Sequence, residues 1–126
     1  MLQHVTLEVA AQDIERSLEL WELLGFRRVE PPADLAGTFV WVERGGTQIH
    51  LERNPSPVVP LHGHAAVVVA DFEEAVDRLL AAGFEVDRGR EHWGAARAKA
   101  VAPGGHRVEL MAAAPPPGAD GAKRGD

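Results

Sequence analysis

The sequence of 126 residues contains no cysteine, which excludes disulfides, iron–sulfur clusters and thiolate metal sites. It also lacks an excess of basic charge: the formal net charge of −6 disfavours nucleic acid or an anionic membrane as the main partner. No apolar run approaches the length of a membrane span, and residues 1–20 carry charges where a signal peptide would have an apolar core. We therefore expect a cytoplasmic globular protein in which any metal is held by histidine, carboxylate or asparagine side chains.

An internal repeat is the main organising feature of the chain. The stretch GHRVELMA (105–112) aligns with the earlier stretch GTQIHLER (46–53), and a Gly-Phe pair recurs at nearly the same interval. Such self-similarity indicates two copies of one structural unit. Four side chains able to bind metal occupy equivalent places in the two copies: His4 corresponds to His64, and His50 to Glu109.

Each copy is expected to contain a strand, a helix, a short strand and a hairpin, because apolar residues alternate in the strands and recur at helical spacing between them. The first module spans residues 1–53, a proline-rich connector spans 54–63, and the second module spans 64–112. The Pro/Gly/Ala-rich tail, 113–126, is expected to be flexible. The predicted fold class is α+β, with a mainly antiparallel sheet.

The hairpins predict which side chains share a face. If Gly45-Gly46 is a two-residue turn, Trp41 lies opposite His50 and Phe39 lies opposite Glu52. The same reasoning with Gly104-Gly105 as the second turn places Ala100 opposite Glu109. We therefore expect an aromatic wall, Phe39 and Trp41, facing a wall of small residues around Ala100.

A divalent cation needs three or four deprotonated ligands that converge from separate elements. If the copies are related by an approximate two-fold axis, His4, His50, His64 and Glu109 approach it together. A lone histidine on a strand is more often a surface or core group than a ligand, and the repeat-equivalent positions are what favour the metal interpretation. Of the other histidines, we expect His62 in the connector and His106 on the surface.

The strand–helix–hairpin repeat, the Gly-Phe after each helix and the closing Gly-x-x-Val-Glu-Leu resemble the vicinal oxygen chelate superfamily, the glyoxalase, bleomycin-resistance and extradiol-dioxygenase group. The resemblance implies two βαβββ modules that form an open, curved sheet around a central cleft. It also implies a divalent metal (Zn, Ni, Co, Mn or Fe) held by His4, His50, His64 and Glu109. His50 departs from the pattern, because glyoxalase I of the bacterial type has glutamate there.

The remaining candidate residues surround that cleft. Glu109 and Glu52 are the candidate catalytic residues for proton transfer. The substrate would contact side chains of the two walls and of a loop near the cleft mouth: Phe39, Trp41, Ala100, His92 and Trp93.

Three functions are compatible with these residues. The first is a metal-dependent, glyoxalase-like lyase or isomerase for a small substrate with vicinal oxygens. The second is an Fe(II) extradiol-type dioxygenase, for which two histidines and one glutamate suffice. The third is a non-catalytic drug-binding protein of the bleomycin-resistance type. We expect a homodimer, because a small open sheet leaves edges and apolar surface uncovered, and the site would be completed either within one chain or across the dimer.

Overall fold

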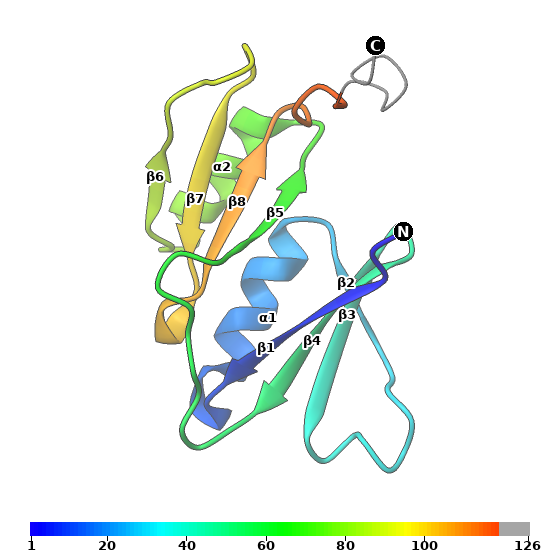
Figure 1. The fold of residues 1–126 in the computed structure, drawn as a ribbon. Helices are drawn as coiled ribbons and strands as arrows, with labels where there is room; N and C mark the ends of the chain where they lie inside the picture. The colour runs from blue at the N-terminus through cyan, green and yellow to red at the C-terminus, as the bar shows by residue number, and fades with distance from the viewer. Residues whose placement is uncertain (119–126) are drawn as a thin grey trace.

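The structure is a computed structural model that describes residues 1–118. The first module contains four strands and one α-helix, and the second repeats that order (Figure 1). The elements of the first module are β1 (His4–Val9), a 3-10 turn (Ala11–Asp13), α1 (Ile14–Leu23), β2 (Arg27–Val29), β3 (Phe39–Arg44) and β4 (Thr47–Arg53). Those of the second are β5 (Ala65–Val68), α2 (Phe72–Ala81), β6 (Val86–Arg88), β7 (Arg97–Val101), a 3-10 turn (Pro103–Gly105) and β8 (Arg107–Met111).

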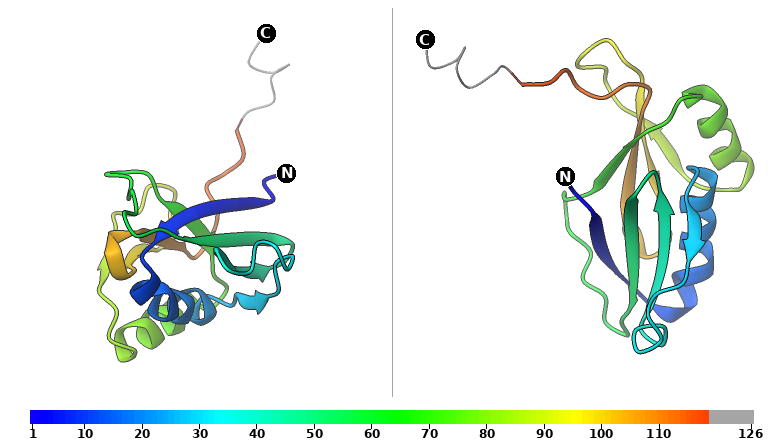
Figure 2. Two further views of the ribbon diagram at one scale, coloured as in Figure 1. Left: turned by 90° about the horizontal axis from the view of Figure 1, so that it is seen from below. Right: turned by 90° about the vertical axis from the view of Figure 1, so that its right-hand side faces the viewer.

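Each module forms its own four-stranded sheet, with strand orders β1-β4-β3-β2 and β5-β8-β7-β6. The first and last strands of each module pair in parallel, and the other pairs are antiparallel. Both helices cover the same side of the two sheets, which leaves the opposite faces uncovered by helix (Figure 2). The predicted α+β fold with two βαβββ modules is confirmed.

The core lies between the sheets and the helices. Alternation in β1 directs Val5, Leu7 and Val9 towards this core, so that His4 and Thr6 occupy the other face. On α1 the fully buried side chains include Leu18 and Trp21. Because the buried residues of both modules belong to one cluster, the modules share a single hydrophobic core.

Two arginines of the first module join it to the second. Arg44 donates from Nη1 to the Leu24 carbonyl at the end of α1 (2.9 Å) and from Nη2 to the Val68 carbonyl at the end of β5 (2.8 Å). Arg16 on α1 donates to the Ala82 carbonyl at the end of α2 (2.6 Å). Each guanidinium therefore satisfies a carbonyl at a helix C-terminus, where the backbone lacks intrahelical partners.

The first hairpin has the predicted register. Its two-residue turn, Gly45-Gly46, has positive φ values of 58° and 85°, and Trp41 pairs with His50. Glycine is favoured here because other residues adopt such φ values only with strain.

The predicted register of the second hairpin is wrong by one residue. Pro103 opens a 3-10 turn, which lengthens the connection so that Val101 pairs with Arg107. Lys99 therefore lies opposite Glu109, and Ala100 pairs with Val108 in the core. A shift of one residue moves every side chain of a strand to the other face, so the proposed small-residue wall at Ala100 is corrected to a face that carries Lys99 and Arg97.

Neither helix is capped by the aspartate side chain that precedes it, and α1 follows directly on a 3-10 turn. Within residues 1–118, no helix is long and apolar enough to cross a membrane. Of the predicted flexible tail, residues 119–126 lie outside the described residues.

Candidate functional site

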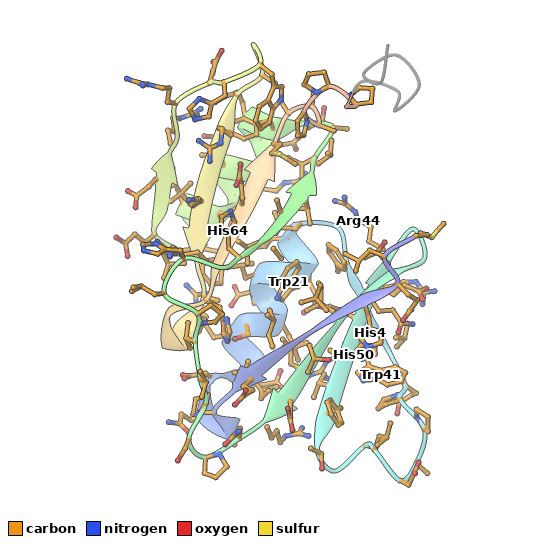
Figure 3. The ribbon with its side chains drawn as sticks, in the orientation of Figure 1. His4, Trp21, Trp41, Arg44, His50 and His64 are labelled. Carbon is orange, nitrogen blue, oxygen red and sulfur yellow. The ribbon has the colours of Figure 1, made fainter. Side chains whose placement is uncertain are left out.

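Three rings stack on the exposed face of the first sheet. His50 on β4 lies between His4 on β1 and Trp41 on β3, with ring centroids 4.1 Å and 4.0 Å away (Figure 3). The parallel β1–β4 pairing and the β3–β4 hairpin bring these three strands together in that order. The stack is therefore a direct consequence of the sheet topology.

The hydrogen bonds of this stack fix the ring nitrogens. His4 donates from Nδ1 to Oε1 of Gln3 (2.6 Å), and His50 donates from Nε2 to Oε1 of Gln48 (2.8 Å). In a neutral imidazole the other nitrogen then carries a lone pair. Burial lowers the pKa of His50 below its ordinary value, and the adjacent His4 lowers it further. His50 is thus held in the neutral form that a metal ligand requires.

A cavity of about 500 Å³, which we call the aromatic cavity, opens beside this stack. The stacked rings of His4, Trp41 and His50 form part of its lining, together with Phe39 and Leu35. Nε1 of Trp41 is buried and has no hydrogen-bond partner within residues 1–118. Such an orphaned donor is uncommon in native structures, and here it belongs to a residue that lines a cavity of ligand size.

The second sheet carries a different group. His64, just before β5, directs Nε2 to Oε1 of Glu109 on β8 at 2.9 Å, and Arg97 on β7 donates from Nε to Oε2 at 2.8 Å. The hydrogen bond from Arg97 lowers the pKa of Glu109, which outweighs the opposing effect of burial, and His64 lowers it further. Glu109 is therefore a carboxylate at neutral pH although it is only 5% exposed.

The tautomer of His64 makes this group informative. Nδ1 of His64 lies 2.8 Å from the backbone carbonyl of His62, which only accepts, so Nδ1 carries a proton. In a neutral ring, Nε2 would then present a lone pair to the lone pairs of Glu109. The 2.9 Å contact requires a positive species between the two atoms: either a second proton on His64 or a metal ion.

The donor residues thus fit a divalent metal in chemistry but form two separate pairs. His4 and His50 lie on one sheet and His64 lies on the other, apart from them (Figure 3). Over the described part of the chain, no three histidine, aspartate or glutamate side chains gather closely enough to hold an ion. A single copy of the chain therefore presents two separate pairs of donor side chains, one on each sheet.

A second cavity, of about 270 Å³, lies between the edge strands β1 and β5, and we call it the junction cavity. Its lining includes Thr6, His64, His106 and Arg107. The sequence predicted His106 on the surface, but in the structure it is buried. It is 7% exposed and donates from Nε2 to the Glu8 carbonyl (2.7 Å). This contact joins the start of β8 to the end of β1. The repeat did not predict it, because the position equivalent to His106 in the first module is Thr47.

The remaining predicted residues line neither cavity. Glu52 lies two residues after His50 on β4, on the same face of the strand, but does not line the aromatic cavity. His92 and Trp93 lie in the loop before β7. His92 is exposed there, and Trp93 donates from Nε1 to the Ala113 carbonyl (3.0 Å). Ala100 is fully buried in the core, and the structure does not bring it to the site.

Sequence reasoning missed Arg97 and Lys99, and it did not identify Gln48 as the hydrogen-bond partner of His50. Lys99 pairs with Glu109 as Trp41 pairs with His50, and Arg97 lies two residues earlier, at the place that Phe39 occupies in the first sheet. Pro103 within the turn was the available signal that the second hairpin connection is longer.

Two βαβββ modules that share one core place the chain in a class of α+β proteins built from paired open sheets. The sequence model of the Glyoxalase/Bleomycin resistance protein/Dioxygenase superfamily matches residues 2–110. The chain therefore belongs to this superfamily. No curated protein matches the sequence.

Solved structures with the same fold include proteins of different kinds. A glyoxalase-family protein from Bacillus anthracis is 22% identical, with a TM-score of 0.78, and the match covers 88% of this chain and 93% of that one. The oxidase ChaP-H2 is 21% identical, with a TM-score of 0.73 and coverage of 90% and 94%. TnmS3, an antibiotic-binding protein from Streptomyces sp. CB03234, is 21% identical, with a TM-score of 0.70 and coverage of 88% and 93%. At this identity, the likeness establishes the fold.

Proposed function

We propose that the protein is a divalent-metal-dependent, glyoxalase-like lyase or isomerase that acts on a small substrate with two adjacent oxygens. The observation that carries the proposal is the contact between His64 Nε2 and Glu109 Oε1, two atoms that either a metal ion or a second proton on His64 would hold together. The equivalent positions of the first module hold a second pair, His4 and His50, whose hydrogen bonds leave one ring nitrogen of each available.

The metal would be held by His4, His50, His64 and Glu109, and it would supply Lewis acidity to the substrate oxygens. The chain's own residues have supporting roles. Arg97 and the His62 carbonyl orient Glu109 and His64, as hydrogen-bond partners of metal ligands commonly do. Glu109 or Glu52 would move the substrate proton, Glu109 being the better placed because it already lies in the donor group.

We propose that the complete site forms between two copies of the chain in a homodimer. The pair His4 and His50 of one copy would meet the pair His64 and Glu109 of the other. The separation of the pairs on two sheets supports this arrangement, and the helix-free faces of both sheets leave room for it (Figure 2).

Metal analysis of variants tests the proposal. Protein purified without chelator should contain stoichiometric nickel, zinc, cobalt or manganese, and His50→Ala and Glu109→Gln should each lose it. His62→Ala, which removes an exposed side chain and keeps the carbonyl bonded to His64, is the matched control and should keep the metal. Wild-type protein without stoichiometric metal would refute the enzymatic proposal, and iron with oxygen consumption would favour a dioxygenase.

Mixing two inactivated variants tests whether the site is shared. One variant carries His4→Ala and His50→Ala, and the other carries His64→Ala and Glu109→Gln. Neither should bind metal alone, but a heterodimer of the two should hold one ion, because one of its two sites combines the intact pairs. If each variant is folded by circular dichroism and their mixture binds no metal, the site does not form across the dimer.

A metal-free ligand-binding protein is the second candidate. The aromatic cavity favours it, because a volume of about 500 Å³ with aromatic walls suits a small organic molecule without any ion. The solved structure of TnmS3 shows that an antibiotic-binding protein has this fold. Tight binding of an aromatic ligand by wild-type protein that contains no metal would favour this function.

A further inference from the structure

We propose that the ligand is an elongated anion, with a planar apolar group in the aromatic cavity and a carboxylate or phosphate at Arg107 in the junction cavity. This inference rests on the proposed function only in placing the substrate on the same faces of the two sheets. It names a substrate class that the metal ligands alone do not specify.

The two cavities are neighbours. Thr6 on β1 lines both of them, and its Cα partner across the β1–β4 pair is His50. Successive side chains on one face of a strand are about 7 Å apart, so a ligand that passes Thr6 reaches from His4 and the ring stack towards His64. Thr6 is therefore the residue at which the two chemically different ends of the proposed binding surface meet.

The end at the aromatic cavity is built for a planar group. Trp41, His50 and His4 present stacked rings, and Phe39 and Leu35 add apolar surface. Ring stacking contributes about 0.5–1.5 kcal/mol beyond the burial of area. The unpartnered Nε1 of Trp41 adds a donor for which the described part of the chain supplies no acceptor.

The end at the junction cavity is built for an anion. Arg107 donates from Nη2 to the Leu61 carbonyl, and no carboxylate of residues 1–118 lies within ion-pair distance of it. A guanidinium has five N–H donors, so several remain for a planar or tetrahedral anion. His64, which lines the same cavity, contacts the carboxylate of Glu109. The negative charge of that carboxylate is already paired with the guanidinium of Arg97.

The charge of the linings supports the same assignment. The whole chain has 19 acidic and 13 basic residues, yet neither cavity lining contains an aspartate or glutamate. The acidic side chain closest in sequence to the ring stack on β1, Glu8, accepts from Asn54 (2.8 Å) and from the Val58 amide (3.2 Å). An anionic ligand would therefore enter a site from which the protein's own carboxylates are absent or already bound.

Three naphthalene probes test the inference by calorimetry: 2-naphthylacetate, 2-naphthyl phosphate and the neutral 2-(2-naphthyl)ethanol. At low salt we expect at least one anion to bind the protein, as purified, about tenfold more tightly than the alcohol, which corresponds to about 1.4 kcal/mol. Either anion's preference supports the proposal, and the tighter of the two identifies the carboxylate or the phosphate as the group selected. Equal affinity for all three probes would overturn it.

Variants locate the two ends. Arg107→Gln should remove the anion preference, Arg107→Lys should restore part of it, and the exposed Arg78→Gln on α2 should leave it unchanged. Trp41→Leu should weaken all three probes alike and keep their ratio. An anion preference that remains in Arg107→Gln, or probe affinities that are unchanged in Trp41→Leu, would contradict the assignment.

The metal content of the same wild-type preparation separates this inference from the proposed function. Anion preference in protein without metal would leave the ligand class standing and refute the metal enzyme. Stoichiometric metal without anion preference would leave the metal enzyme standing and refute the proposed ligand class.

Discussion

Replacing Arg44 with methionine should destabilise the protein by about 2 kcal/mol. Its guanidinium donates to the Leu24 carbonyl at 2.9 Å and to the Val68 carbonyl at 2.8 Å, which links α1 to the second module. A hydrogen bond from a charged donor contributes about 1.5–3 kcal/mol net, and we take about 1 kcal/mol for each because Arg44 is only half-buried. Methionine keeps most of the apolar stem, so the loss measures the guanidinium.

Urea denaturation followed by circular dichroism checks this magnitude. With an m-value of about 2 kcal/mol per molar, the midpoint should fall by about 1 M. Arg44→Lys should recover at most half, because a single ammonium does not span both carbonyls. Arg27→Met is the matched control: its ion pair with Glu43 is exposed and 3.5 Å long, so its removal should cost about 0.5 kcal/mol or less. An Arg44→Met midpoint that matches the Arg27→Met midpoint would refute the proposed link.

The remaining predictions concern protonation and packing. In metal-free protein, NMR titration should show His50 losing its proton at a lower pH than a free imidazole. Because the unfolded chain binds that proton more readily, the free energy of unfolding should fall as pH drops below about 6.5. His50→Gln should flatten this pH dependence. Arg97→Met should raise the pKa of Glu109 in a ¹³C titration, since the strongest cause of its lowering is removed. Leu79→Ala, at a fully buried position, should cost about 2–5 kcal/mol in urea denaturation, whereas the half-exposed neighbour Leu80→Ala should cost far less. An unchanged Glu109 pKa, or equal effects at the two leucines, would contradict these readings of the structure.

The first module was predictable from the sequence because its signals are local. Alternation over residues 3–9 and the Gly45-Gly46 turn determine which side chains of β1, β3 and β4 share a face, so Trp41 opposite His50 needed no tertiary information. The second hairpin contains the same glycine pair, but Pro103 before it starts a 3-10 turn and lengthens the connection. Because the side-chain period of a strand is two, that difference replaces Ala100 with Lys99 on the site face.

The arrangement of the four donors depends on a different level of structure. The repeat places His4 and His64, and likewise His50 and Glu109, at equivalent positions in the two modules. Strand pairing within each sheet then brings His4 to His50 and His64 to Glu109. The distance and orientation between the two pairs depend on the core shared by the two modules and on long-range contacts such as those of Arg16 and Arg44. The repeat contains no signal for these contacts. The sequence could therefore predict which donors occupy equivalent positions, but it predicted that all four approach one axis, and within residues 1–118 no three of them come together. If the four bind one ion, they do so across two copies of the chain or after the modules change their relative position, and the mixed-variant metal measurement distinguishes these two cases.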